Sequence, residues 1–250
     1  MMKRRTIRIG QIVPSSNTTM ETEVPAFLRA YAANTDGLDF TFHSSRMRMK
    51  HVRKEELAAM DADSHRCARE LADALIDVAG YACLVAIMAM GLGYHRRSEN
   101  NLMRIAAEEG QPYPVVTSAG ALVSELRHMG CRKAALIMPY SDELARTVVE
   151  YVEAEGIEVA DYRNFSVANN LDVGRIPGSR LLEALRDLSG AGADVTVLSA
   201  CVQMPSLDSL EEARRLSRTP VTSTAECTAR AMLRTIGLPV ETPRLAEVAP

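Results

Sequence analysis

The sequence lacks tryptophan and has few aromatic residues of any kind. Phe, Trp and Tyr make up 4% of its 250 residues, which argues against a platform on which nucleic-acid bases could stack. It also lacks a basic surplus, because 29 Lys and Arg are set against 32 Asp and Glu, for a formal net charge of −3. We therefore expect binding neither to nucleic acid nor to an anionic membrane surface.

Long apolar runs and cofactor motifs are missing as well. The longest apolar run, Tyr81 to Met90, is about half of the ~20 residues that a membrane-spanning helix requires. The basic start, Met1 to Arg5, is followed by a short strand and a turn rather than by the apolar region and cleavage site of a signal peptide. Gly91 and Gly93 lack the third glycine and the downstream acidic residue of a dinucleotide-binding loop. We expect a cytoplasmic protein with no nucleotide cofactor.

Five cysteines are present, an odd number with no Cys-x-x-Cys pair: Cys67, Cys83, Cys131, Cys201 and Cys227. Without a secretory signal, disulfides are not expected. No cluster of Cys and His has the spacing of zinc ligands, so we expect no metal site. Each cysteine is therefore a small buried hydrophobe or a reactive thiol. Cys67 lies on the apolar face of an expected helix, which favours packing.

Apolar strand-like runs alternate with helical segments along the whole chain, which is typical of βαβ units and parallel sheets. Strands are expected at Arg8–Val13, Asp39–His43, Val78–Ala82, Val115–Ser118, Ala134–Met138, Glu158–Tyr162, Asp194–Ser199 and Val221–Ser223. Helices are expected at Thr19–Tyr31, Lys54–Ala79, Ser98–Glu109, Ser118–His128, Asp142–Glu155, Ser179–Ser189, Ser206–Leu216 and Thr224–Ile236.

Two features recur in the same order, which indicates a twofold repeat. A strand ending in Val13-Pro14-Ser15-Ser16-Asn17 is matched by one ending in Met138-Pro139-Tyr140-Ser141-Asp142, and the strand before Cys83 is matched by the strand before Cys201. We expect two similar α/β halves facing each other across a cleft. The first comprises residues 1–120 plus a C-terminal helix at about 224–250, and the second comprises 121–223. Open parallel sheets bind ligands at the carboxyl ends of their strands.

Cys83 and Cys201 each follow an apolar strand, so a pseudo-twofold axis could bring them together. Backbone N–H groups past a strand end can bind an anion and lower the pKa of a thiol. The alternative is that both are core residues, since free cysteine is among the most buried residue types.

The turn Pro14 to Thr19 contains more polar residues than a helix cap needs. Asn17 or Thr18 could cap the next helix, and the same donors could hold a carboxylate. Tyr140 occupies the matching turn of the second half and could donate to a carboxylate or be a half-buried tyrosine. Asn169 and Asn170 fit an asparagine-rich turn. Of the scattered histidines, only His95 follows the Cys83 strand, and a surface loop is its simpler interpretation.

The sequence closely resembles maleate cis-trans isomerases, within the wider Asp/Glu racemase and arylmalonate decarboxylase superfamily. The resemblance extends to about residue 240 and is carried by the stretches Ile9 to Glu23, Phe42 to Met49, Tyr81 to Ala86 and Ser199 to Ser206. The racemases usually have Cys-Asn-Thr at one cysteine, whereas Leu84-Val85 and Val202-Gln203 follow the cysteines here. The decarboxylases usually keep only the second cysteine, so Cys83 counts against them.

The resemblance implies two Rossmann-like halves, usually in a homodimer, that isomerise maleate to fumarate without a cofactor, as in nicotinate degradation. It makes Cys83 the nucleophile and Cys201 the proton donor. It assigns the substrate carboxylates to Asn17, Tyr140 and Asn170, helped by backbone amides of Leu84, Val85 and Val202. Two alternatives stay open: a two-cysteine racemase or epimerase of an acidic amino acid, and a non-catalytic carboxylate-binding protein.

Overall fold

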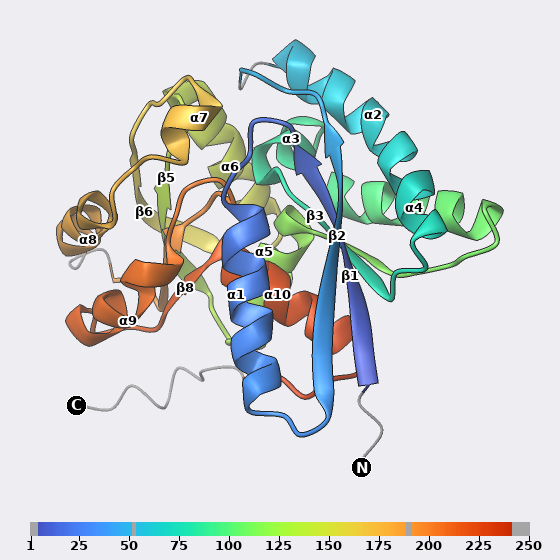
Figure 1. Ribbon diagram of the computed structural model, residues 1–250. Coiled ribbons are helices and arrows are strands. Elements are labelled where there is room, and N and C mark those ends of the chain that lie inside the picture. The colour runs from blue at the N-terminus through green and yellow to red at the C-terminus, as the bar shows by residue number, and fades with distance from the viewer. Residues whose placement is uncertain (1–4, 52–53, 189–191, 242–250) are drawn as a thin grey trace.

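The computed structural model describes residues 5–51, 54–188 and 192–241, and each half of the chain forms one sheet with its helices (Figure 1). The first half contains β1 (Arg5–Pro14), α1 (Met20–Ala33), β2 (Leu38–Met47), α2 (Lys54–Asp73), β3 (Val78–Tyr81), α3 (Leu84–Ala89), α4 (Tyr94–Glu108), β4 (Val115–Thr117) and α5 (Ser118–His128). The second contains β5 (Lys133–Met138), α6 (Asp142–Ala154), β6 (Glu158–Asn164), α7 (Asn170–Val173), α8 (Gly178–Asp187), β7 (Val195–Ser199), α9 (Leu207–Leu216), β8 (Val221–Ser223) and α10 (Thr224–Thr235).

The two sheets have the same topology. Their strand orders are β2-β1-β3-β4 and β6-β5-β7-β8, and every pairing is parallel. Replacing β1 to β4 by β5 to β8 converts one order into the other, which confirms the α/β fold of two similar parallel-sheet halves. In each sheet the second strand is added on one side of the first strand and the third strand on the other side. Open parallel sheets bind ligands at this switch point, between the first and third strands.

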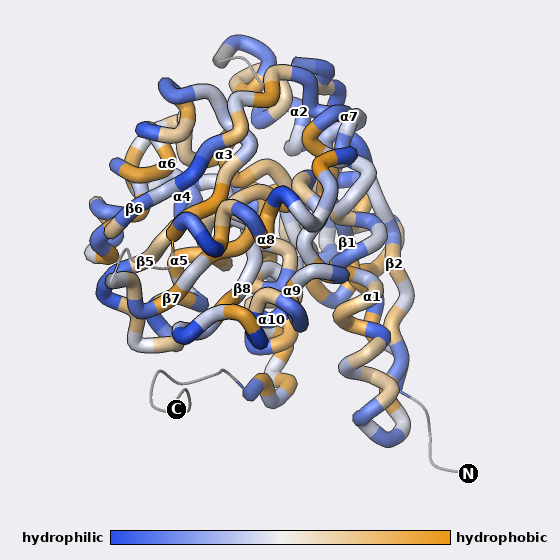
Figure 2. The backbone as a smooth tube through the Cα atoms, turned by 90° about the vertical axis from the view of Figure 1, so that its left-hand side faces the viewer, coloured by the Kyte–Doolittle hydropathy of each residue, from blue (hydrophilic) through white to orange (hydrophobic). Residues whose placement is uncertain are grey.

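Helices α1 and α10 join the two halves. They pack against each other, α10 also packs against α5, and in Figure 1 both lie between the two sheets. Buried apolar side chains form one core that continues through both halves, and Figure 2 shows the most hydrophobic segments inside and hydrophilic ones on the outer helices and turns. The expected division near residue 120 falls within α5 and stays a prediction, as does the assignment of the C-terminal helix to the first half.

Several predicted boundaries are wrong. The helix predicted for Lys54–Ala79 ends at Asp73, because Leu75 adopts a left-handed φ of 53° that no helix can continue through. Two short helices, α3 and α7, were not expected. The C-terminal helix ends at Thr235, and part of its expected range, 242–250, lies outside the described residues. Within the described residues, no helix is both long and apolar enough to cross a membrane.

Candidate active site

The two cysteines occupy equivalent places beside equivalent turns. The N–H of Ala82 donates to the carbonyl of Ile12 at 2.9 Å, and the N–H of Ala200 donates to the carbonyl of Ile137 at 2.8 Å. Each of these alanines precedes a cysteine, and each of these isoleucines lies two residues before the proline of its turn. The repeat therefore places Cys83 beside the Pro14 turn and Cys201 beside the Pro139 turn.

A small cavity of about 20 Å³ joins these elements. It is lined by Pro14, Asn17, Met49, Cys83, Val85, Tyr140, Asn170, Cys201, Val202 and Gln203. The cavity thus brings together every predicted site residue except Leu84, which is buried next to it in sequence but does not line it. Its volume suffices for about one water molecule, so a dicarboxylate can enter only if the surrounding residues move apart.

Cys83 has a strained backbone and an uncharged thiol. Its φ is 88° and its ψ is 72°, in the left-handed region that is costly for a residue with a Cβ. It directly precedes α3, whose Ala86 N–H donates to the sulfur, but burial dominates and raises the pKa of the thiol to about 12. The backbone donor acts in the expected direction, but burial outweighs it in the closed cavity, because one N–H does not replace the lost water.

Cys201 has a less strained backbone and more hydrogen-bond donors. Burial raises the pKa of this thiol too, while the neighbouring Tyr140 hydroxyl and the backbone N–H groups of Gln203 and Met204 oppose the shift. The residue is 8% exposed, and its φ is not among the positive φ values of the described chain. A thiolate would therefore be better stabilised at Cys201 than at Cys83.

Asn17 caps a helix with one end of its amide and leaves the other end available. Its Oδ1 accepts from the N–H groups of Thr19 and Met20, both at 2.9 Å, at the start of α1. Its Nδ2 has no hydrogen-bond partner among the described residues, although the side chain is buried and lines the cavity. The cap is thus present, and a donor remains for a ligand.

Tyr140 and Asn170 both reach the cavity with their donors engaged. The Tyr140 hydroxyl donates to the carbonyl of Ala200 at 3.1 Å and lies beside the sulfur of Cys201. Asn170, the first residue of α7, donates from Nδ2 to the hydroxyl of Ser16 at 2.9 Å, across the two halves. Asn169 instead caps α7 by accepting from the Leu171 N–H at 2.9 Å. The structure therefore brings Asn170, and not Asn169, to the cavity.

Sequence reasoning missed three lining residues, Pro14, Met49 and Gln203, as members of the site. Pro14 and Gln203 belong to the stretches that flank Asn17 and Cys201, so position in the motif was an available signal. Met49 follows β2, and the antiparallel bridge between His51 and Asn169 holds this segment against the second half. Nothing in the local sequence indicates that contact.

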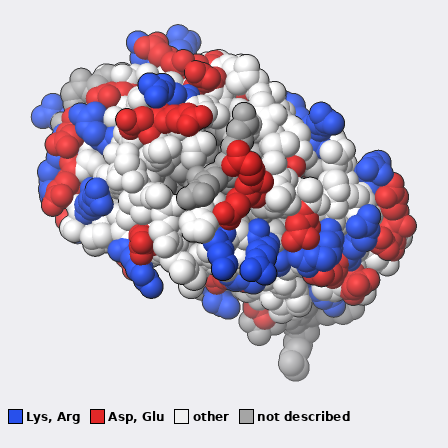
Figure 3. Space-filling view, turned by 90° about the horizontal axis from the view of Figure 1, so that it is seen from above, with Lys and Arg blue, Asp and Glu red and all other residues white. Residues whose placement is uncertain are grey.

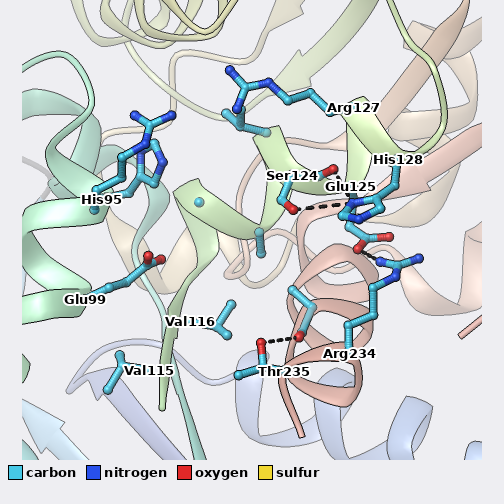
Figure 4. A pocket seen from close by; sticks show the side chains of 15 residues that line it. His95, Glu99, Val115, Val116, Ser124, Glu125, Arg127, His128, Arg234 and Thr235 are labelled. Atoms are coloured by element: carbon cyan, nitrogen blue, oxygen red, sulfur yellow. Dashed lines mark hydrogen bonds and ion pairs between the residues drawn. The ribbon is translucent and has the colours of Figure 1, made fainter. Parts of the chain in front are cut away.

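A second, larger cavity of about 490 Å³ lies between α4, α5 and α10 (Figure 4). It contains His95 but neither Cys83 nor Cys201, and in Figure 4 Arg234 reaches toward Glu125 within it. His95 is buried in α4 and contacts the Tyr151 hydroxyl at 2.5 Å, so it is not in a surface loop, and it does not line the cavity of the two cysteines. The lining of the larger cavity contains Ser124 and His128 but no cysteine, and we place the active site in the smaller cavity, where two thiols meet.

On the face drawn in Figure 3, charge does not single out an anion site. Seen from above the view of Figure 1, basic and acidic side chains alternate around uncharged areas (Figure 3). Across the described part of the chain, no group of three or more His, Cys, Asp or Glu side chains could hold a metal ion. Recognition of a dianion would therefore depend on the polar groups inside the cavity.

Comparison with known proteins gives a consistent result. The arylmalonate decarboxylase family model matches residues 9–248. A maleate isomerase from Alcaligenes faecalis is 51% identical over 98% of this chain and 96% of its own length. The structure of a cysteine-to-alanine variant of the maleate isomerase Iso from Pseudomonas putida S16 with maleate is similar at a TM-score of 0.93 and 48% identity, covering 96% of this chain and 95% of that one. A cysteine-to-serine mutant of the Nocardia farcinica maleate cis-trans isomerase with a covalently bound succinylcysteine intermediate has a TM-score of 0.90 and 46% identity, covering 96% of both chains.

Proposed function

The chain belongs to the arylmalonate decarboxylase family, and from this membership and its near-full-length similarity to maleate isomerases we propose that it isomerises maleate by cysteine catalysis. The observation that carries the proposal is the meeting of Cys83 and Cys201 in one cavity with polar groups from both halves. Two thiols and a set of uncharged donors suit a reaction on a small dicarboxylate that needs a nucleophile and a proton donor.

The chemistry must remove a double bond temporarily, because the central bond of maleate cannot rotate. The Cys83 thiol first loses its proton to solvent. The resulting thiolate adds to one alkene carbon, and the thiol of Cys201 gives its proton to the other carbon. The product is a succinyl thioether with a single central bond, which rotates. Cys201 then takes the proton back and the carbon–sulfur bond breaks, which releases fumarate and restores the Cys83 thiolate. Substrate and product have the same oxidation state, so the cycle consumes no electrons.

The hydrogen bonds around the two sulfurs support this assignment of roles. Addition removes the negative charge from Cys83 and leaves it on Cys201. Two backbone N–H groups donate to Cys201, and the Tyr140 hydroxyl lies beside it, whereas one backbone N–H donates to Cys83. The cavity therefore stabilises the charge where the addition step places it.

The carboxylates of the substrate need donors at both ends of the cavity. We assign this role to Asn17, Tyr140 and Asn170, together with the backbone N–H groups of Leu84, Val85 and Val202. The free Nδ2 of Asn17 supports its part in this set most directly. The first-turn amides of α3 have no acceptor within the helix, which supports the backbone groups after Cys83.

One experiment tests the proposed function. The purified protein is incubated with maleate and no added cofactor, and the vinyl protons are followed by NMR. We expect the maleate signal to be replaced by that of fumarate. Unchanged maleate together with loss of optical activity from one aspartate enantiomer would identify a racemase instead. Inertness toward both, with saturable maleate binding, would identify a carboxylate-binding protein.

The family resemblance further supports a homodimer and a role in nicotinate degradation. Light scattering on the purified protein tests the first, with a mass of two chains expected. Growth on nicotinate after deletion of the gene tests the second. The cytoplasmic location stays a prediction from the sequence.

A further inference from the structure

Gln203 makes polar contacts across the cavity with every polar atom of its side chain. Its Oε1 accepts from the N–H of Thr18 at 2.8 Å. Its Nε2 donates to the carbonyl of Ser16 at 3.2 Å and to the carbonyl of Asn170 at 2.8 Å. The residue is 2% exposed and lies two positions after Cys201. A single amide in the second half therefore holds the first-half turn on both sides of Asn17.

The backbone of Gln203 adds a further bond to the same turn. Its carbonyl accepts from the hydroxyl of Thr19 at 2.8 Å. Glu23, one turn further along α1, accepts from the N–H of Ser206 at 2.5 Å, the N–H of Leu207 at 2.7 Å and the Ser206 hydroxyl at 3.0 Å. The loop that carries Cys201 is thus bonded to the first half along its length.

We propose that Gln203 is a positioning residue that sets the distance between Asn17 and Cys201. The inference rests on the proposed function, in which Asn17 holds a carboxylate and Cys201 serves the adjacent carbon. An amide is the side chain that suits this place, because it satisfies one N–H and two carbonyls at once. In a nearly waterless cavity, any of these groups left without a partner would carry the full cost of its desolvation.

The space beside Gln203 is also restricted. A Cβ added at Gly174, which follows α7, would lie 2.6 Å from Nε2 of Gln203. Gly174 itself has an ordinary φ of −68°, so an alanine there suits the backbone. The Gly174→Ala substitution therefore displaces the Gln203 amide without removing any of its partners.

The test compares Gln203→Met with Gln11→Met. Methionine keeps the length of glutamine and lacks its hydrogen bonds. Gln11 is a matched control because it is 1% exposed and its partners among the described residues lie in the first half: it donates to the carbonyl of Met20 and accepts from the hydroxyl of Ser44, both at 3.4 Å. We expect Gln203→Met to lower kcat/KM about 10²-fold, chiefly through kcat, because small displacements of reacting groups have effects of this size. Gln11→Met should keep wild-type kinetics and a melting temperature similar to that of the wild type.

A second measurement reports on the cavity without using activity. Alkylation of Cys201, compared with the fully buried Cys227, should be several-fold faster in Gln203→Met than in the wild type, because the loop is no longer held against the turn. Wild-type kinetics and wild-type labelling in this variant would overturn the proposal. So would equal losses in the Gln203 and Gln11 variants.

The Gly174→Ala variant decides the matter if Gln203→Met does not fold. Like Gln203→Met, it should lower kcat and speed the labelling of Cys201, each by about tenfold. Unaltered values would refute a positioning role. Inactive wild-type protein would count against the proposed function alone, because the labelling comparison remains readable in that case.

Discussion

The loops that follow β3 and β7 begin alike and then differ. Both leave a buried strand through an alanine that donates to the neighbouring strand, and both then present a cysteine to the cavity. After Cys83 the chain enters α3 immediately, through a left-handed residue. After Cys201 it makes a turn that directs two N–H groups at the sulfur and bonds to the other half through Gln203. The repeat brings the two thiols together, and the difference between the loops gives them unequal environments.

Unequal environments are what an addition and elimination cycle requires. A racemase that removes a proton from either face of a carbon needs two thiols of similar character. An isomerase attacks with one sulfur and protonates with the other. It therefore needs a poorly stabilised, reactive thiolate at the attacking sulfur and a well stabilised thiolate at the sulfur that has given up its proton. The greater number of donors at Cys201 matches the second case.

The largest expected effect is the loss of turnover when either cysteine is replaced, and the two replacements should block different steps. Cys83→Ala removes the nucleophile and should lower kcat at least about 10⁴-fold. Cys201→Ser should also lose turnover, because serine is a far weaker acid than a thiol and exchanges its proton poorly at neutral pH. Addition at Cys83 can still occur in that variant, with water supplying the proton to the other carbon, and elimination becomes the blocked step because no thiolate is there to take that proton back.

Intact-protein mass spectrometry after exposure to maleate measures this difference. Cys201→Ser should gain the mass of one substrate at Cys83, and Cys83→Ala should gain none. An adduct on Cys201 in the Cys83→Ala protein would reverse the two roles. Activity in both variants without any adduct would exclude covalent catalysis.

Asn17→Asp sharpens the comparison on the substrate side. Aspartate caps a helix as well as asparagine does, so the bonds to Thr19 and Met20 and the melting temperature should be retained. The variant loses the Nδ2 donor and places a negative charge beside the dianion, so kcat/KM should fall about 10²-fold. Asn17→Ala is the control, because it removes both functions and should also cost about 1 kcal/mol of stability. Normal kinetics in Asn17→Asp would show that the residue is only a cap.

The sequence was sufficient to predict the sheets and to name seven of the ten residues that line the small cavity. Most strand boundaries lie within two residues of prediction, because apolar runs and capping residues mark them, as Ser223 does before α10. β1 begins three residues earlier and β2 ends four residues later than predicted, at Arg5 and Met47. α3 was missed because its six residues, Leu84 to Ala89, are all apolar and too short to show helical periodicity. The end of α2 was missed because Leu75, and not a glycine, takes the left-handed position.

The parts of the site that could not be predicted depend on contacts between distant residues. The bonds of Gln203 to Ser16 and Thr18 join positions 187 and 185 residues apart. The thiol pKa values likewise depend on how tightly the cavity closes, which no local motif specifies. Geometry at strand ends can be predicted from one half of a repeat, whereas the fit between the halves cannot.

Thiol reactivity should follow access and pH. Because burial raises the pKa of both Cys83 and Cys131 to about 12, alkylation of each should rise about tenfold per pH unit between pH 7 and 9, as the thiolate fraction does. Cys83 is only partly buried, so it should react faster than Cys131 and Cys67 at every pH, and maleate should protect it. Peptide mapping after timed alkylation measures these rates. A plateau for Cys83 above pH 7 would reveal a low pKa, contrary to the closed cavity.

The smallest expected effect concerns backbone strain and isolates the difference between the loops. A left-handed residue with a Cβ costs roughly 1–2 kcal/mol, and glycine avoids that cost. Cys83→Gly should therefore be more stable than Cys83→Ala by about 1 kcal/mol, although both lack the thiol and both are inactive. At Cys201, where φ is not left-handed, glycine only adds freedom to the unfolded chain, so Cys201→Gly should be less stable than Cys201→Ala by about 0.5–1 kcal/mol. The two comparisons thus have opposite signs, and they correspond to shifts in Tm of about 2–4 °C at Cys83 and about 1–4 °C at Cys201. Equal signs at the two positions would mean that the strain at Cys83 relaxes when the sulfur is removed, and that the thiol, rather than the backbone, maintains the left-handed conformation.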